Sequence, residues 1–189
     1  MDSSFLNMEL RLTRKKIKAI QSLAKPTELK DVQKITGCIV ALSQFIARLG
    51  EKAITLYRLL KKLDKFVWDQ EADDAFELLK KILTEAPVLA APQPREPMLL
   101  YIAAGPRAVS VVVVVERKEE AKGHPVQRPV YYVSEVLSEA KQRYPHWQKL
   151  VFGVFMASRK LKHYFQEHPI IMVSSVPLVE IIRNIEAKG

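Results

Sequence analysis

Carboxylates are the first residues to consider in this sequence, because pairs of them can hold divalent metal ions or act as general acids and bases. Asp73 and Asp74 are adjacent near the start of a predicted helix, and Glu135 and Glu139 lie on a short stretch that we expect to be helical. Acidic residues in a first helical turn complement the helix dipole, and glutamates on a short helix usually face water. We therefore predict solvated carboxylates, and neither a metal site nor a catalytic site, at both pairs.

Histidines and serines offer no better candidate for chemistry. The four histidines never occur at the i, i+4 spacing of a helical zinc site; they are His124, His146, His163 and His168. Ser174 and Ser175 have neither the glycine-rich elbow of a serine hydrolase nor an evident acid to orient His163. The sequence therefore predicts no zinc site and no serine nucleophile.

Two basic clusters are candidates for contact with phosphate groups. The first lies late in a long predicted helix and comprises Arg159, Lys160 and Lys162; the second lies near the N-terminus and comprises Arg14, Lys15, Lys16 and Lys18. Cations late in a helix also complement its C-terminal dipole, so a solvated basic face is the alternative for the first cluster. The net charge of +9 favours an acidic partner, but the positive excess is spread along the chain and also fits a merely soluble basic surface.

The composition predicts a folded, intracellular protein. With 189 residues and 48% hydrophobic content, the chain can bury a core, which argues against disorder. The single cysteine, Cys38, excludes an internal disulfide and a CxxC motif, and its apolar surroundings predict a buried thiol. We find neither a signal peptide nor an apolar stretch of the roughly 18 residues that a membrane span needs, so we expect a soluble protein without a membrane partner.

The elements that position these residues fall into two halves. Apolar residues recur at intervals of three and four over 15–81, which predicts helices. Pro26 should end the first helix, Thr27 should cap the second, Gly50 should end a helix in a left-handed turn, and Asp69 should cap a helix that begins near Gln70. We therefore predict a helical region over 1–85, followed by a linker over 86–97 that contains four prolines.

The second half, 98–189, has the pattern of an α/β or α+β domain. We predict strands over 98–103, 108–116, 129–134 and 170–174, with a charged turn over 117–128. We also predict one helix over 144–165, with Phe155 on its apolar side, and a last helix near Pro177. The valine-rich second strand is apolar on both faces, as expected for a central strand. Three consecutive strands, a helix and a fourth strand predict a mixed sheet, with a meander followed by a crossover.

Several segments resemble the reverse-transcriptase region of plant gypsy-class retrotransposon polyproteins. LKDVQKITGCIVALSQFIARLGEKA and LLKKLDKFVWDQEADDAFELLKKIL are similar to the thumb-like segment that follows the polymerase palm. LLYIAAGPRAVSVVVVVERKEE, VQRPVYYVSEVLSEAKQRYPHWQKLVFGVFMASRKLKHYF and PLVEIIRN are similar to the RNase H-like domain that comes next. The resemblance runs from about Lys15 to the C-terminus and implies thumb-like helices before a truncated RNase H-like fold of about four strands with flanking helices.

The resemblance also implies where the catalytic acids of the family would stand. Active members cleave the RNA strand of an RNA–DNA hybrid with Mg²⁺ ions held by carboxylates from LYVDAS, YxxxEKE and TDH or TDQ motifs. The matching positions in this chain are Ala103 of YIAAG, Gln148 of RYPHWQKL and Ser175 of VSSVPL. A methyl, an amide and a hydroxyl group cannot replace carboxylate charge around divalent cations, so we expect no catalysis and no cofactor.

Three hypotheses about function follow. The first is a non-enzymatic interaction module that binds nucleic acid with low sequence specificity, binds a protein partner, or self-associates through an exposed sheet edge. The second is a part of a larger reverse transcriptase that supports hybrid binding or cleavage. The third is a relic without a selected role.

Overall fold

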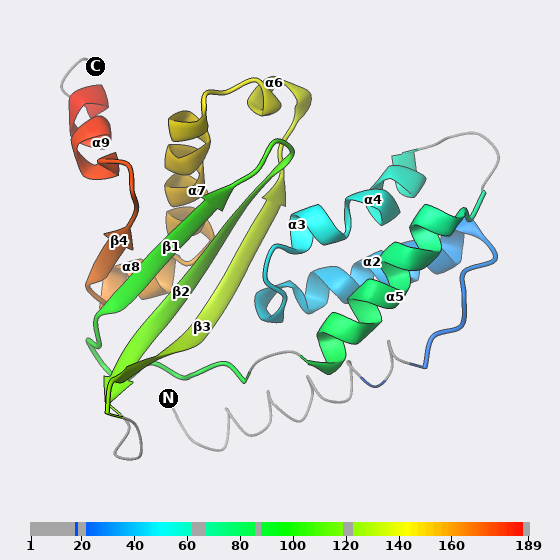
Figure 1. Cartoon of the computed structure of the whole chain (residues 1–189), viewed down its shortest axis with the longest axis horizontal. Coiled ribbons are helices and arrows are strands. Elements are labelled where there is room, and N and C mark those ends of the chain that lie inside the picture. The colour runs from blue at the N-terminus through cyan, green and yellow to red at the C-terminus, as the bar shows by residue number, and fades with distance from the viewer. Residues whose placement is uncertain (1–17, 19–21, 62–66, 86–87, 119–122, 187–189) are drawn as a thin grey trace. The chain divides into compact units, whose positions relative to one another are not determined.

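The computed structural model describes residues 18, 22–61, 67–85, 88–118 and 123–186. The chain divides into two compact units, residues 1–87 and 88–189, which are described separately below (Figure 1). The division falls inside the proline-rich segment 86–97. Residues 88–97 belong to the second unit.

The described part of the first unit is helical, as predicted. Its elements are α2 (Leu29–Ala41), η1 (Ser43–Phe45), α3 (Leu49–Lys52), α4 (Ile54–Lys61) and α5 (Gln70–Thr84). Apolar side chains at helical spacing are fully buried, among them Val32, Ile39, Leu56, Phe76 and Leu79. Burial of these side chains stabilises helices that are too short to persist alone.

One helix end agrees with its prediction and two differ. Asp69 caps α5, because its carboxylate accepts a hydrogen bond from the backbone N–H of Ala72 at 2.9 Å. Thr27 was predicted to cap the second helix, but the residue at that position is Glu28, and Thr27 instead donates its backbone N–H to Asp31 at 3.2 Å. Gly50 was predicted in a left-handed turn, but it lies inside α3, and Arg48 before it has the left-handed backbone with φ 56°.

The prediction of a buried Cys38 is wrong, since the residue is exposed on α2. The buried face of this helix is set by Val32, Ile35 and Ile39. Successive residues of a helix are rotated by about 100° around its axis, so Cys38 points away from the face that contains Ile39. The apolar surroundings of Cys38 in the sequence therefore do not surround it in space.

The second unit contains a four-stranded mixed sheet, which confirms the predicted fold class. Its strands are β1 (Met98–Ala104), β2 (Ala108–Lys118), β3 (Pro125–Val136) and β4 (Ile170–Val173). They are ordered β3-β2-β1-β4, with β1 antiparallel to β2, β2 antiparallel to β3 and β4 parallel to β1. The valine-rich β2 is an interior strand, as predicted. The hairpin from β2 to β3 is longer than predicted, because both strands continue into the charged segment that was expected to be a turn.

The helices of this unit are α6 (Glu139–Gln142), α7 (His146–Lys160), α8 (Lys162–Glu167) and α9 (Leu178–Glu186). The prediction of a single helix over 144–165 is wrong, because the backbone turns at Leu161 and separates α7 from α8. Leu161 itself is buried in the core of the unit, as its place on the apolar side of the predicted helix implies. The last helix begins directly after Pro177, as expected.

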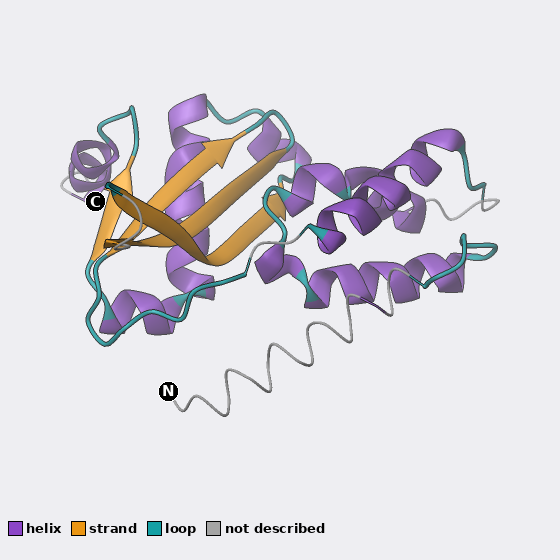
Figure 2. Cartoon of the chain, turned by 60° about the horizontal axis from the view of Figure 1, so that its bottom comes forward, coloured by secondary structure: helices purple, strands orange, loops and turns teal. Residues whose placement is uncertain are grey.

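Helix α7 packs closely against one face of the sheet (Figure 2). A Cβ atom added at Gly153 would lie 2.7 Å from Cγ2 of Ile102 and 2.9 Å from Cγ1 of Val109, so glycine is what permits this approach. The contact also fixes which side of the helix is buried: Leu150, Met156 and Ala157 face the core, whereas Phe155 is 57% exposed. Phe155 was predicted on the buried side, and that prediction is wrong.

Residues 88–97 are attached to the sheet by a charged cluster. Arg117 of β2 donates two hydrogen bonds to the Glu96 carboxylate, at 2.8 and 2.7 Å, and one to the carbonyl of Ala91 at 2.7 Å. His168 Nδ1 lies 3.0 Å from the carbonyl oxygen of Glu96. The Arg117 guanidinium, by its hydrogen bonds and charge, lowers the pKa of Glu96 below its ordinary value.

Candidate functional site

Two of the three positions where the resemblance places catalytic acids meet at one end of the sheet. Ala103 lies near the carboxyl end of β1, and Ser175 lies two residues beyond β4. In the parallel pairing of these strands Tyr101 is opposite Val173. The same register continued by two residues sets Ala103 opposite Ser175, at the edge where parallel strands end.

Gln148, the third position, is in the first turn of α7 and belongs to the same end of the unit. The neighbouring Lys149 is 8% exposed, and its ammonium group donates to the carbonyl of Pro106 in the turn between β1 and β2, at 3.4 Å. This contact ties the start of α7 to the carboxyl end of β1. The three positions that the resemblance assigned therefore all lie toward the end of the unit at which β1 ends.

The residues at this end of the sheet do not fit a divalent metal ion. Mg²⁺ needs several oxygen ligands that include carboxylates, whereas Ala103, Gln148 and Ser175 offer a methyl, a neutral amide and a hydroxyl. Lys149 adds a positive charge close by, which opposes a second cation. Within the described parts of the chain, no group of three or more histidine, cysteine or acidic residues could hold a metal ion.

Of the N-terminal basic cluster, only Lys18 can be located. Arg14, Lys15 and Lys16 lie outside the described residues. Lys18 is exposed, and its carbonyl accepts a helical hydrogen bond from the backbone N–H of Ser22 at 3.1 Å. The predicted phosphate contact at this cluster stays a prediction.

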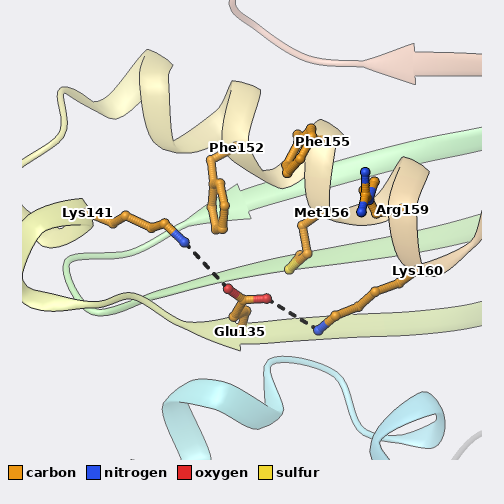
Figure 3. Close-up of a pocket in the computed structure, with 7 residues that line it drawn as sticks. All are labelled: Glu135, Lys141, Phe152, Phe155, Met156, Arg159 and Lys160. Atoms are coloured by element: carbon orange, nitrogen blue, oxygen red, sulfur yellow. Dashed lines mark ion pairs between the residues drawn. The ribbon is translucent and has the colours of Figure 1, made fainter.

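The C-terminal basic cluster is divided between two helices. Arg159 and Lys160 end α7, and Lys162 begins α8; all three are exposed. Arg159 and Lys160 line a pocket on the α7 side of the sheet, together with Glu135, Lys141, Phe152, Phe155 and Met156 (Figure 3). Glu135 was predicted on a helical stretch, but it belongs to β3, whereas Glu139 is exposed on α6.

Charges alternate across this pocket. The Glu135 carboxylate lies 3.4 Å from the Lys160 ammonium and 3.9 Å from the Lys141 ammonium, as the dashed lines of Figure 3 show. Lys141 also lies 4.0 Å from the ring centre of Phe152, and the Arg159 guanidinium lies 5.8 Å from that of Phe155. The pocket thus combines one carboxylate, three cations and an apolar lining.

Sequence reasoning did not find this pocket. It joins the end of β3, the helix α6 and one side of α7, which are brought together only when the sheet and α7 pack. A partial signal exists, because Phe152, Phe155, Met156 and Arg159 recur at intervals of three and four on one helix. That pattern could not reveal the pairing of Lys160 with Glu135.

The acidic pair in the first unit is less solvated than predicted. Asp73 accepts a hydrogen bond from the Trp68 indole at 3.0 Å and pairs with Lys25 at 2.9 Å. These two contacts lower the pKa of Asp73. Asp74 is exposed and accepts a hydrogen bond from Gln70 on the same helix at 2.8 Å. Asp73 therefore joins the start of α5 to the segment that carries Lys25, which is a structural role.

A comparison of the chain with models of known protein families finds one match. Residues 68–172 match the family described as the RNase H-like domain found in reverse transcriptase. The chain belongs to this family. The RNase H-like part of the resemblance is confirmed, and the match includes Ala103 and Gln148.

Curated relatives of this RNase H-like chain are retroviral and transposon polyproteins. The Gag-Pol polyprotein of baboon endogenous virus (strain M7) is 26% identical over 179 residues, which are 92% of this chain and 10% of the relative. The retrovirus-related Pol polyprotein from transposon 297 of Drosophila melanogaster is 24% identical over 175 residues, 92% of this chain and 16% of the relative. The chain thus spans a small fraction of the length of these polyproteins.

Solved structures support the same fold. The foamy viral protease-reverse transcriptase dRH in complex with double-stranded DNA has a TM-score of 0.75 at 21% identity, over 90% of this chain and 29% of the viral one. The same viral enzyme in complex with an RNA/DNA hybrid has a TM-score of 0.73 at 22% identity, over 86% of this chain and 21% of the viral one. No helix among the described residues is both long enough and apolar enough to span a membrane.

Proposed function

We propose that this RNase H-like chain is a catalytically silent module of a plant-type gypsy-class retroelement and acts by binding other molecules. The observation that carries the proposal is the set of side chains toward the end of the unit at which β1 and β4 end and α7 begins. Ala103, Gln148 and Ser175 supply no carboxylate there. Without carboxylates, neither activation of a water by metal nor stabilisation of a leaving oxygen is available.

Nucleic acid is the first partner class that we propose. The structural neighbours were determined with double-stranded DNA and with an RNA/DNA hybrid, and this chain carries a net charge of +9. Exposed lysines are available in both units, namely Lys18, Lys30, Lys34 and Lys162. Flexible lysines bind phosphate as point charges, so we expect little sequence preference. The alternative is that the chain supports hybrid binding or cleavage within a larger reverse transcriptase.

Self-association through β4 is the second element of the proposal. This edge strand pairs only with β1 among the described residues, and Ile171 and Val173 are 50% and 38% exposed. Unpaired backbone groups beside exposed apolar side chains favour strand addition by another molecule. Light scattering coupled to size exclusion tests this, and a mass of one chain at every concentration would contradict it.

Catalytic silence is tested by incubating the full chain with a labelled RNA–DNA hybrid and Mg²⁺ or Mn²⁺. We expect no cleavage above the rate without protein. Cleavage that persists after further purification and is abolished by chelation would refute the proposal. An active RNase H in parallel confirms that the substrate and the metal are competent.

A restored variant tests whether the three positions form the lost site. We expect the combined substitution Ala103→Asp, Gln148→Glu and Ser175→Asp to create Mn²⁺ binding, measured as a metal-dependent rise in Tm. The unmodified chain should show no such rise. The matched control makes the same three kinds of substitution at exposed positions of the first unit, Ala41→Asp, Gln33→Glu and Ser22→Asp, and should bind no metal. Equal behaviour of the two triple variants would show that the positions do not converge.

A further inference from the structure

The pocket between β3, α6 and α7 has an apolar interior large enough for a side chain of another protein. Met156 is 3% exposed and contributes to its floor, while Phe155 is 57% exposed at its side. Its volume of about 300 Å³ is at the lower end of the range for ligand pockets, which suits one side chain with its flanking backbone. Exposed aromatic side chains beside a concave surface are typical of contact sites.

The charges of the pocket favour an anionic ligand. Lys141 and Lys160 share the Glu135 carboxylate, whereas Arg159 has no carboxylate partner among the residues that the structure describes. The planar guanidinium of an arginine binds a carboxylate through two parallel hydrogen bonds. A ligand with a carboxylate next to an apolar group could pair with the Arg159 guanidinium and pack against the exposed ring of Phe155 at the same time.

Two features favour a peptide over nucleic acid at this pocket. The Glu135 carboxylate lies among the cations and repels a phosphodiester chain, whose charges follow one another closely. Single-stranded nucleic acid also needs free aromatic faces on which bases stack. Lys141 covers a face of Phe152, and Arg159 lies near the ring of Phe155, so fewer faces remain.

We propose that this pocket binds an acidic segment of a partner protein, with a carboxylate of the partner on Arg159 and an apolar side chain against Phe155 and Met156. The proposal rests on the role of the chain as an interaction module and does not require nucleic-acid binding. Glu135 already holds Lys141 and Lys160 in place before a ligand binds. Binding therefore costs little side-chain conformational entropy at the pocket.

The test uses the full chain, labelled with ¹⁵N, and a short synthetic peptide in which a central phenylalanine is flanked by aspartates. We expect titration to shift backbone resonances of Glu135, Lys141, Phe155 and Arg159, with an affinity also measurable by fluorescence anisotropy of labelled peptide. A peptide with lysines in place of aspartates, and one with alanine in place of phenylalanine, should bind at least about tenfold more weakly, equivalent to about 1.4 kcal/mol.

Two exposed substitutions locate the binding on the protein. Arg159→Glu and Phe155→Ala should each lower the affinity for the aspartate peptide by about tenfold. The first removes the contact with a peptide carboxylate, and the second removes the contact with the peptide phenylalanine. The matched control is Arg107→Glu, an equal charge reversal at an exposed arginine in the turn between β1 and β2, which should change the affinity by less than about twofold.

Three outcomes would overturn the proposal. The first is that no backbone resonance of the pocket residues shifts when the peptide is added, and the second is that Arg159→Glu and Arg107→Glu lower the affinity for the peptide equally. The third is that a short oligothymidylate displaces the peptide from the pocket. The last would assign the pocket to single-stranded nucleic acid. None of these outcomes bears on hybrid cleavage, so failure of the peptide site is distinguishable from failure of catalytic silence.

Discussion

The backbone of Arg95 is in the left-handed region, with φ 59°, at the third position of a turn over 93–96. Pro94 precedes it, and the backbone N–H of Glu96 donates to the carbonyl of Gln93 at 3.0 Å. This pattern is that of a type II turn, in which glycine is preferred where arginine stands. The local strain is tolerated because Glu96 is held by Arg117 on the sheet.

We predict that Arg95→Gly stabilises the second unit. The gain should be about 0.5 kcal/mol, because relief of the left-handed strain exceeds the entropy that glycine adds to the unfolded chain. Chemical denaturation of both proteins measures it. Arg95→Ala retains the Cβ atom and should not stabilise, so equal gains from both substitutions would contradict the explanation by backbone strain.

The ion pair of Glu96 and Arg117 should make the stability of this unit depend on pH. The pKa of Glu96 is lowered in the folded state, so its contribution is fully present above the unfolded pKa and is lost as pH falls through the folded pKa. At neutral pH, Glu96→Gln should cost about 2 kcal/mol, since its side chain is largely buried and Arg117 loses a charged acceptor. Chemical denaturation at a series of pH values from about 7 to about 3 measures this difference in the free energy of unfolding, which should become smaller as the pH falls.

The control for this pH dependence is an ion pair whose carboxylate is exposed. Glu77 pairs with Lys80 on the surface of α5 at 3.1 Å, and its side chain is 65% exposed. Glu77→Gln should change the free energy of unfolding by less than about 0.5 kcal/mol at any pH. A loss as large as that of Glu96→Gln would mean that burial of the pair is not the cause.

At the scale of elements, the packing of α7 on the sheet can be tested with two helical glycines, of which Gly153 is crowded by other side chains and Gly37 is not. Gly153→Ala should destabilise by about 1 to 3 kcal/mol, because the new methyl would meet the branched side chains of Ile102 and Val109. Gly37→Ala in α2 should stabilise by about 0.5 to 1 kcal/mol, since no atom lies within 4 Å of the added Cβ. Thermal or chemical denaturation measures both. A stabilising Gly153→Ala would contradict the close approach of α7 to the sheet.

The elements also show where periodicity in sequence is informative. The valines of β2 predicted an interior strand correctly, because a strand with neighbours on both edges and packing on a face needs apolar side chains throughout. The apolar residues around 144–165 predicted a helix correctly, but neither its break at Leu161 nor the exposure of Phe155. The exposure of Phe155 depends on the packing of α7 against Ile102 and Val109, which are distant in sequence.

At the scale of the whole molecule, we predict that any binding of nucleic acid depends strongly on salt and weakly on sequence. The net charge of +9 and the exposed lysines on α2, α8 and at Lys18 favour release of counterions from phosphates. Affinity for hybrids of unrelated sequence should be equal within about threefold and should fall by about tenfold or more when salt is raised from 50 to 200 mM. Anisotropy across a salt series measures this, and a flat series would contradict electrostatic binding.

The amino-acid sequence by itself determined the helical first half, the strand segments, the mixed pairing of the sheet and the absence of carboxylates at Ala103, Gln148 and Ser175. These follow from local periodicity, proline positions and residue identity, which do not depend on distant contacts. Tertiary structure alone decided that Cys38 and Phe155 are exposed, that Arg117 holds Glu96, and that Glu135 meets Lys141 and Lys160. The physical reason is that a side chain's surroundings are set by which helix face packs and by strand register, and both are fixed by residues far apart in the sequence.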